Sequence, residues 1–357
     1  MSIFRSNLSE PPIGILVIGT LPPPPGGTQI CLRILVQSLE TREDIRVKVI
    51  DTAGIRGHFP AGFWRLFQVI SRILKEGRGV DIITLHVASS AVSFWGIIVL
   101  FLSRLLRKPL VVRKFGGTDY LNYWGPVRGH LGHFVVRHAD LYLAETKHLV
   151  QLAESRGIRH VKWFPTNRPA GEPVEFRETG QDTGWRFAYI GHVRPYKGIA
   201  EMIEAAERFD ENVSVDVYGP FFDGFSEKTF ERCRRVKYRG VLPPEQVIPT
   251  MRQYNATLLP TKALTEGYPG AILESFIAGV PVIVTRCGAI PEIVDDTCGL
   301  LVVPGDADAL YAAMKALVDN RTLYARLREG VRKKRMDFSS EVWTERFIEY
   351  CKDAAGC

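Results

Sequence analysis

The sequence predicts an α/β protein built from two Rossmann-like β/α/β domains that face each other across a cleft. Apolar runs of strand length alternate with segments of helical periodicity along most of the chain, as in parallel sheets with helical crossovers. A stretch rich in Gly, Pro and charged residues, 168–184, lacks this periodicity and divides the alternation in two. With 357 residues, 46% hydrophobic and 24% charged, the chain can bury two cores. We therefore expect one domain at 1–170 and a second at 185–338.

The first domain begins with a strand at 13–19 that is apolar throughout, which is typical of a parallel strand covered on both faces. A turn at Gly26-Gly27-Thr28 and a helical stripe over 30–39 follow, so this segment is the opening of a Rossmann-like unit. The two glycines lack the G-x-G-x-x-G spacing of a dinucleotide site, and a tight turn explains them equally well.

The rest of the first domain continues the alternation. Strands are expected at 47–50, 81–86, 109–114, 141–144 and 161–164, with a helix at 63–75. A second helix begins at 91 and ends in the basic stretch 104–108; a core helix and an interfacial membrane helix both fit it. His86 lies at a strand's C-terminal end, where open parallel sheets bind ligands, so it is a candidate site residue alongside a purely structural role.

The second domain repeats this pattern. Strands are expected at 187–190, 213–218, 236–238, 257–259, 282–285 and 300–303, and helices at 199–208, 306–317, 323–333 and 342–351. Within it, 260–285 brings two glutamates, Glu266 and Glu274, to either side of a Gly/Pro loop that begins a helix near Gly270. The N-terminus of a helix offers unpaired N–H groups and a positive dipole end, so this loop is suited to phosphate. By itself the pattern also fits a solvated loop, because such units are common in α/β proteins.

The net charge indicates which classes of molecule the chain can bind, and the cysteines indicate its compartment. The 46 Lys and Arg residues exceed the 39 Asp and Glu residues, giving +7, which favours a nucleotide, a phospholipid surface or nucleic acid. Nucleic acid is not expected, since the basic residues are dispersed and the one tight cluster, 332–335, lies at a predicted helix end. The six cysteines form no C-x-x-C pair, and the N-terminus carries no secretory signal, so we expect reduced thiols in the cytoplasm.

No metal site is expected. The three histidines 130, 133 and 138 share a helical segment without a carboxylate or cysteine ligand beside them, and no Asp-x-Asp motif is placed to hold Mg²⁺.

A series of motifs in the second domain is similar to a known family. In order, the series comprises Gly191…Arg194-Pro195-x-Lys197-Gly198, a strand near Tyr238–Val241, Leu259-Pro260 before Glu266-Gly267, Glu274, Ala278–Val282 and Gly288–Glu292. Over roughly 186–305 the chain resembles the retaining glycosyltransferases of family 4, the group 1 transferases with the GT-B fold. In the first domain only the Gly26-Gly27 turn, the strand ending at His86, the Gly116-Gly117 turn and Asp119 are similar.

The resemblance implies that the second domain binds a nucleoside-diphosphate sugar and the first binds the acceptor, with the C-terminal helix, 340–357, returning to the first domain. By the same resemblance Glu266 contacts hydroxyls of the donor sugar and Glu274 the ribose. Lys197 then faces the diphosphate together with Arg194 or His192. The remaining donor-binding residues are expected to be Gly26, Gly27, Gly267, Tyr268, Pro269, Gly270, Ala271 and Val241.

The first domain departs from the family pattern. The family's usual histidine near the fourth strand is absent from Arg113-Lys114-Phe115-Gly116-Gly117, and a basic residue there or His86 is expected in its place. The catalytic set predicted from the resemblance is therefore Glu266, Lys197, Arg194 and His86.

The expected function is retaining, metal-independent glycosyl transfer without a cofactor, from a nucleotide sugar to a saccharide or lipid-linked saccharide, in bacterial surface polysaccharide synthesis. A peripheral contact with the inner face of the cytoplasmic membrane is expected from the basic charge and the helices at 63–75 and 94–108. The alternatives are a sugar-nucleotide epimerase, a dinucleotide-dependent oxidoreductase and a catalytically silent sugar-nucleotide binding protein.

Overall fold

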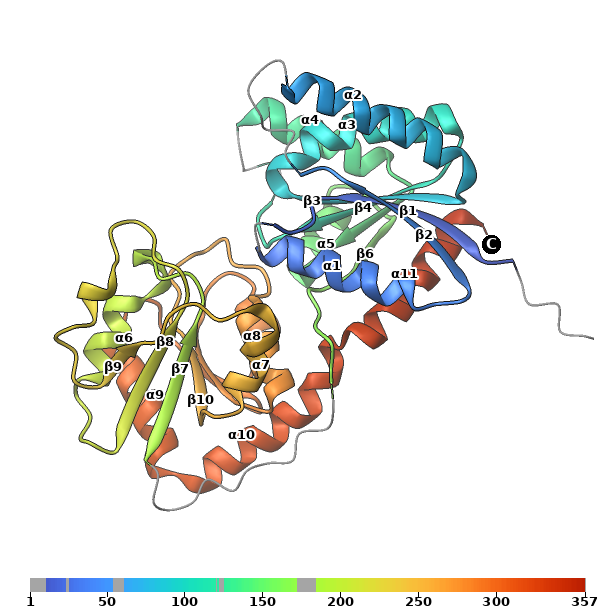
Figure 1. Cartoon of the computed structure of the whole chain (residues 1–357). Coiled ribbons are helices and arrows are strands. Elements are labelled where there is room, and N and C mark those ends of the chain that lie inside the picture. The colour runs from blue at the N-terminus through green and yellow to red at the C-terminus, as the bar shows by residue number, and fades with distance from the viewer. Residues whose placement is uncertain are drawn as a thin grey trace, which may run out of the picture.

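Two parallel six-stranded sheets form two lobes (Figure 1). The computed structural model of the chain describes residues 11–23, 26–53, 61–119, 121, 125–171 and 184–356. The first sheet has the order β2-β1-β3-β4-β5-β6 and the second the order β12-β11-β10-β7-β8-β9. The predicted α/β fold class with two facing domains is confirmed.

Strands of the first sheet alternate with helices, as the apolar runs predict. The elements are β1 (Ile13–Gly19), α1 (Gly27–Glu40), β2 (Ile45–Asp51), α2 (Ala61–Glu76), β3 (Ile82–Ala88), α3 (Ser89–Leu106), β4 (Leu110–Phe115), α4 (Pro126–His138), β5 (Leu141–Ala144), α5 (Lys147–Ser155) and β6 (Val161–Trp163). β1 and β5 are buried along their whole length, which accounts for their continuous apolar sequences. β4 is equally buried although it carries Arg113 and Lys114.

The second sheet follows the same rule with shorter strands. Its elements are β7 (Trp185–Ile190), a 3₁₀ turn (Pro195–Lys197), α6 (Ile199–Ala206), β8 (Val213–Tyr218), β9 (Val236–Tyr238), α7 (Pro244–Met251), β10 (Ala256–Leu259), α8 (Gly270–Ala278), β11 (Val282–Thr285), β12 (Gly299–Val302), α9 (Ala307–Asp319), α10 (Arg321–Lys334), a 3₁₀ turn (Arg335–Phe338) and α11 (Ser340–Ala355).

The two sheets differ in where the strand order reverses. In the second sheet the reversal lies between β7 and β10, the Rossmann arrangement, whereas in the first it lies between β1 and β3. Ligands of open parallel sheets bind outside the carboxyl ends of the strands at such reversals. The loops after β1, β3, β7 and β10 are therefore the ones that the topology directs into the cleft.

The last helix, α11, leaves the second lobe and packs on the first (Figure 1). Its Trp343, Phe347 and Ile348 share a core with β1, β3, β4 and α1. The chain therefore passes between the lobes twice, and the two passages are hydrogen-bonded: Arg168 N donates to Phe338 O (3.0 Å) and Ser340 N donates to Arg168 O (2.7 Å).

Two helices lie outside the sequence predictions, α5 and α7. α5 has only nine residues, too few for a clear apolar period. α7 contains Pro244 and Pro249, and an internal proline is a signal against a helix. The predicted divider 168–184 falls largely on 172–183, outside the described residues. Within the described residues, no helix has the length and apolar character needed to cross a membrane.

Candidate active site

A lysine and a glutamate pair where the loops after β7 and β10 meet. Lys197 Nζ binds Glu266 Oε1, which also accepts from Thr261 Oγ1 (3.1 Å). Their side chains are 17% and 14% exposed, so the pair is largely shielded from water yet open on one side. Together they line a cavity of about 300 Å³.

The position of Lys197 depends on the glycine that follows it. Gly198 has φ +75°, and a Cβ there would collide with the carbonyl of Pro260. The loop after β7 therefore rests directly on the loop after β10, and Lys197 is held against Glu266 by backbone geometry.

A second cation–carboxylate pair lies at the start of α8. Arg168 Nε donates to Glu274 Oε1 at 2.7 Å, with the two side chains 6% and 17% exposed. Arg168 Nη1 also donates to Asn167 O (3.0 Å) and to Cys31 Sγ (3.3 Å). Arg168 Nη2 occupies the space that a Cβ on Gly270 would need, so this guanidinium lies directly over the first residue of α8.

The N-terminus of α8 lies between the two pairs without a cap of its own. Its N-cap, Pro269, provides no side-chain hydrogen bond, and no acidic residue lies in the first turn. Such an end keeps its positive dipole and its N–H groups for a ligand. With Lys197 on one side and Arg168 on the other, it can hold an anionic group.

The two lobes touch through two glutamates. Glu145, at the end of β5, accepts from Gly116 N (2.6 Å) and across the cleft from Tyr268 N (2.9 Å). Glu292, in the second lobe, accepts from the N–H groups of Lys147 (2.7 Å) and His148 (3.1 Å) at the start of α5. These contacts close the cleft at the Glu266–Gly270 loop.

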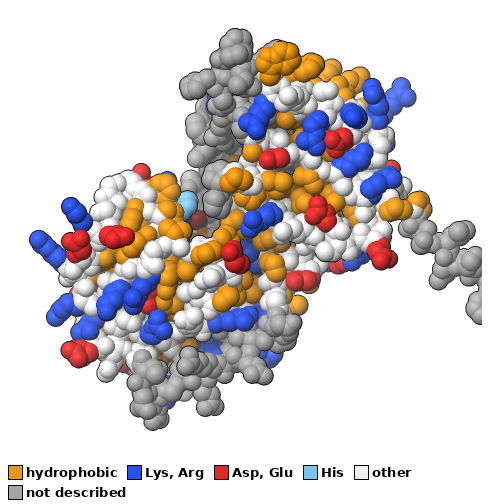
Figure 2. Space-filling model, in the orientation of Figure 1, with side chains coloured by type: hydrophobic (Ala, Val, Ile, Leu, Met, Phe, Trp, Pro, Cys, Tyr) orange, Lys and Arg blue, Asp and Glu red, His pale blue; other side chains and the backbone are white. Residues whose placement is uncertain are grey.

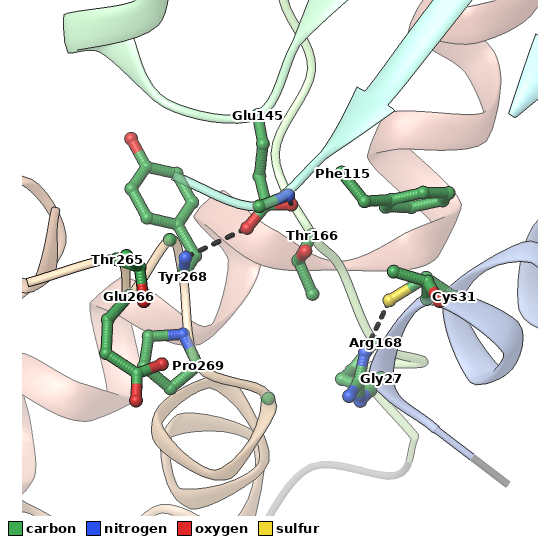
Figure 3. A pocket seen from close by; sticks show the side chains of 14 residues that line it. Gly27, Cys31, Phe115, Glu145, Thr166, Arg168, Thr265, Glu266, Tyr268 and Pro269 are labelled. Atoms are coloured by element: carbon green, nitrogen blue, oxygen red, sulfur yellow. Dashed lines mark hydrogen bonds between the residues drawn. The ribbon is translucent and has the colours of Figure 1, made fainter. Parts of the chain in front are cut away.

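The cavity under this closure is shown in Figure 3. It has a volume of about 210 Å³, with Glu145 and Tyr268 on one side and Arg168 and Cys31 on the other (Figure 3). A Cβ on Gly267 would lie 2.8 Å from Gly117 N and would collide with Glu145, so this approach requires glycine.

A larger cleft of about 500 Å³ extends from this cavity between α1 and the second sheet. The predicted donor-binding residues on its wall are Gly26, Gly27, His192, Val241 and Glu274. Apolar side chains of both lobes also line it, among them Ile30, Ile190 and Ile248. A nucleoside is the type of group that such a wall accommodates.

The structure thus gathers most of the predicted site residues around one helix end, but not all. Arg194 turns away from these cavities: its guanidinium stacks on Phe222 at 4.0 Å and bonds Tyr196 OH at 2.9 Å. Ala271 packs beside the small core of β7, α7 and α8.

His86 lies apart from the cleft cavities. It is 2% exposed, with Nε2 3.1 Å from Thr84 Oγ1 and its ring 5.7 Å from that of Phe347 on α11. Burial and the nearby Arg113 hold the pKa of His86 well below 6.5. A direct contact with a substrate remains a prediction that this buried position does not favour.

Two buried cations, Arg113 and Lys114, lie near the end of β4, next to the loop that begins at Gly116. Lys114 Nζ donates to Gly116 O (3.0 Å), and burial lowers the pKa of Lys114 to about 8. Arg113 lies between the rings of Phe115 and Phe164, at 4.4 and 4.3 Å, and burial lowers its pKa to about 10. Gly116 is therefore held from both sides, its carbonyl by Lys114 and its N–H by Glu145.

Sequence reasoning missed Arg168 and Glu145, the residues that complete the site from the first lobe. No motif marks either one. The only signal was position: Glu145 follows a buried strand, β5, directly at the edge where ligands bind.

Metal ligands are not grouped in the described part of the chain. There, no three His, Cys, Asp or Glu side chains lie close enough together to hold a metal ion.

Comparison with known proteins agrees with this geometry. Residues 172–334 match the family model described as "Glycosyl transferases group 1", which confirms the resemblance to that family over those residues. The chain is 30% identical over 156 residues to "MMP alpha-(1->4)-mannosyltransferase" of Mycolicibacterium hassiacum, covering 41% of this chain and 37% of that protein. It is 29% identical over 133 residues to "O-antigen chain mannosyltransferase B" of Escherichia coli, covering 35% and 34%. The chain thus matches little more than a third of either relative.

Solved structures match over nearly the whole chain. A structure of HepE from Anabaena in complex with UDP has a TM-score of 0.74 at 16% identity, covering 96% of this chain and all of that one. The lipopolysaccharide outer core galactosyltransferase WaaB has a TM-score of 0.70 at 16% identity, covering 95% and 99%. At this identity the matches establish the shared two-lobed fold.

Proposed function

We propose that this chain, which belongs through residues 172–334 to the group 1 glycosyl transferases, transfers a sugar from a nucleoside-diphosphate sugar to a saccharide or lipid-linked saccharide. One observation carries the proposal. Two cation–carboxylate pairs, Lys197–Glu266 and Arg168–Glu274, flank the uncapped N-terminus of α8 at the reversal of the second sheet. A diphosphate with a sugar on one side and a ribose on the other matches that order of groups.

The donor's neutral groups are assigned to the carboxylates. Glu266 binds hydroxyls of the sugar and Glu274 those of the ribose, because a carboxylate accepts two hydrogen bonds from neighbouring hydroxyls. Each carboxylate is held in place by a cation of the protein, which positions it to accept hydrogen bonds from donor hydroxyls. The base lies in the 500 Å³ cleft beside His192 and Val241.

The diphosphate is assigned to Lys197, Arg168 and the N–H groups at Gly270. Arg168 replaces Arg194 in this role, since Arg168 lines both the small cavity and the large cleft, whereas Arg194 is turned to Phe222. These positive groups stabilise the charge that develops on the leaving diphosphate. Gly26 and Gly27 come close to the same space from the first lobe.

Transfer with retention of configuration requires no protein nucleophile in this scheme. The bond from the sugar's anomeric carbon to the diphosphate breaks, the acceptor oxygen bonds on the same face, and the acceptor's proton passes to the departing phosphate oxygen. The chain's task is to orient donor and acceptor and to stabilise the leaving charge. We propose that cations of the protein do this without a metal ion.

The names of similar proteins support a proposal for the acceptor. One relative acts on O-antigen chains and a fold neighbour on lipopolysaccharide outer core. We propose a bacterial surface polysaccharide or glycolipid as the product, made in the cytoplasm at the inner membrane face.

The test begins with thermal shift against UDP-glucose, UDP-galactose, UDP-N-acetylglucosamine and GDP-mannose, because a bound donor raises the Tm. The stabilising donor, radiolabelled, is then supplied with saccharide acceptors, with and without EDTA, and the product's anomeric configuration is read by NMR. Glu266→Ala should abolish transfer, while Glu204→Ala, an exposed glutamate of α6, should not change it. Full transfer by Glu266→Ala would refute the site. Tight donor binding without transfer would favour a silent binding protein, and release of an altered nucleotide sugar an epimerase.

A further inference from the structure

Three helices of the first lobe expose an unusual number of large apolar side chains. Eight of the fourteen large apolar residues that are exposed in the described structure lie on α2, α3 and α4: Trp64, Phe67, Phe94, Phe101, Leu105, Val127, Leu131 and Phe134. Five of these are Trp or Phe, and no Trp or Phe is among the six elsewhere. We call this set the α2–α4 face.

The exposed residues form stripes rather than isolated points. On α3, Phe101 and Leu105 follow Phe94 by two turns and three turns of one helical side, and they are 68% and 61% exposed. On α4, Val127, Leu131 and Phe134 share one side in the same way. The opposite sides of these helices are buried in the first lobe's core. When a helix buries one apolar side in the core and exposes another, the exposed side marks a surface that contacts a second apolar environment.

The same helices, together with the two residues that follow α3, carry an excess of positive charge. The segments 61–76, 89–108 and 126–138 contain eight Lys and Arg residues and one acidic residue, Glu76. Of the 46 basic and 39 acidic residues in the chain, this leaves 38 of each elsewhere. All of the eight basic residues except Lys108 are exposed. Figure 2 shows apolar side chains along the top of the first lobe with Lys and Arg side chains nearby.

We propose that the α2–α4 face docks on the surface of an anionic lipid bilayer. Aromatic and aliphatic side chains enter the interface, while Arg and Lys side chains contact the acidic headgroups. The charge decides against a second copy of this chain, because a symmetric dimer would press two positively charged surfaces together. Nucleic acid fits less well, since Leu105, Val127 and Leu131 would find no partner on a phosphate backbone.

The location of the face connects it to the cleft. In each β–α unit the helix begins at the carboxyl end of the strand, which is the cleft edge of the sheet. Trp64 and Val127 lie in the first turn of their helices and Phe94 in the second turn of α3, so the face reaches that edge. A docked bilayer would present a lipid-linked acceptor beside the active site.

The test is flotation of the full chain with vesicles of equal parts phosphatidylglycerol and phosphatidylcholine, compared with phosphatidylcholine alone. We expect binding to the anionic vesicles, at least tenfold weaker binding to neutral ones, and weakening in 0.5 M NaCl as the charges are screened. The assay contains no nucleotide sugar, so its outcome is independent of the proposed transfer activity.

Two matched double variants test whether vesicle binding depends on the α2–α4 face or on exposed apolar residues in general. Phe101→Gln with Leu105→Gln should reduce anionic-vesicle binding about tenfold or more, while Val303→Gln with Met336→Gln, which are 57% and 49% exposed elsewhere, should not. Circular dichroism and thermal unfolding verify that both variants are folded. Equal vesicle binding by the two variants, no anionic preference, a dimer through this face in ultracentrifugation, or tighter binding to DNA than to vesicles would each overturn the proposal.

Discussion

The two lobes have equal numbers of strands, but they differ in how their candidate functional residues are distributed along the sequence. In the second lobe the chemistry lies within short stretches: Lys197 with Gly198, and Glu266 with Gly270 and Glu274. In the first lobe the important groups are single residues brought from distant parts of the chain, such as Glu145 and Arg168, together with a surface spread over three helices. In the proposed function the second lobe holds the donor through local loops, and the first lobe closes the site and carries the proposed docking surface.

The sharpest test of the second lobe compares its two candidate cations. Lys197→Ala should lower kcat/KM for transfer about 10²–10³-fold, because it removes charge beside the leaving diphosphate. Arg194→Ala should lower it less than about tenfold, since its guanidinium stacks on Phe222 outside the cavities. Steady-state kinetics with the donor found by thermal shift measures both. A greater loss in Arg194→Ala would reverse their roles.

The contact between the lobes is tested at Gly267. Gly267→Ala should reduce transfer about 100-fold, because the added Cβ collides with Glu145 and crowds Gly117 N, so the cleft cannot close. Gly79→Ala, at an exposed glycine of the first lobe, is the control and should retain activity. Comparing the radius of gyration of Gly267→Ala and wild type by solution X-ray scattering would reveal the opening. Unchanged transfer would mean that this closure is not part of the catalytic cycle.

Buried charge in the first lobe should show in stability. The pKa of Lys114 is lowered from 10.5 to about 8, so the unfolded chain binds more protons between these pH values and stability rises with pH across that window. Lys114→Met should therefore raise the unfolding free energy at pH 7 by up to about 3 kcal/mol and flatten that rise. Urea unfolding at pH 7 and 9 checks it, with Lys333→Met, 74% exposed, as the near-neutral control. A less stable Lys114→Met would show that its bond to Gly116 outweighs its burial.

The smallest effect is expected at His86. Its pKa is lowered well below 6.5, so the folded state resists protonation and stability falls as pH drops below 6.5. The fall contributed by this group is at most about 1.4 kcal/mol per pH unit. His86→Phe should lessen the decrease in Tm between pH 7 and 5.5 while preserving the packing with Phe347. An unaltered decrease would mean that other groups dominate acid sensitivity.

The sequence predicted the ends of individual helices and strands, but it did not predict contacts between residues far apart in the chain. Helix α8 begins at Gly270 as its Pro269 and Gly270 indicate, and Gly279 ends it with φ +76°. By contrast, Arg168 meets Glu274 across 106 positions and Glu145 meets Tyr268 across 123. No spacing in a single sequence reports such pairs, since they depend on how two lobes dock.

The burial of His86 also depends on a segment that is distant in the sequence. His86 lies near the end of β3, as the sequence predicted. The helix that covers it, α11, comes from the far end of the chain. The basic cluster 332–335 lies at a helix end as predicted, but Arg335 is buried and donates to Ala170 O at 2.9 Å, a contact that no local pattern indicates.

The paired passages between the lobes have a consequence for how such proteins diversify. Because Arg168 and Ser340 are hydrogen-bonded neighbours, the second lobe is inserted into the first with its two ends side by side. A recombination that exchanges the segment between them replaces the whole second lobe and leaves the first lobe's core intact, apart from the contacts at the cleft. The pair of passages at Arg168 and Ser340 is thus a natural boundary for building chimaeras that combine one first lobe with different second lobes.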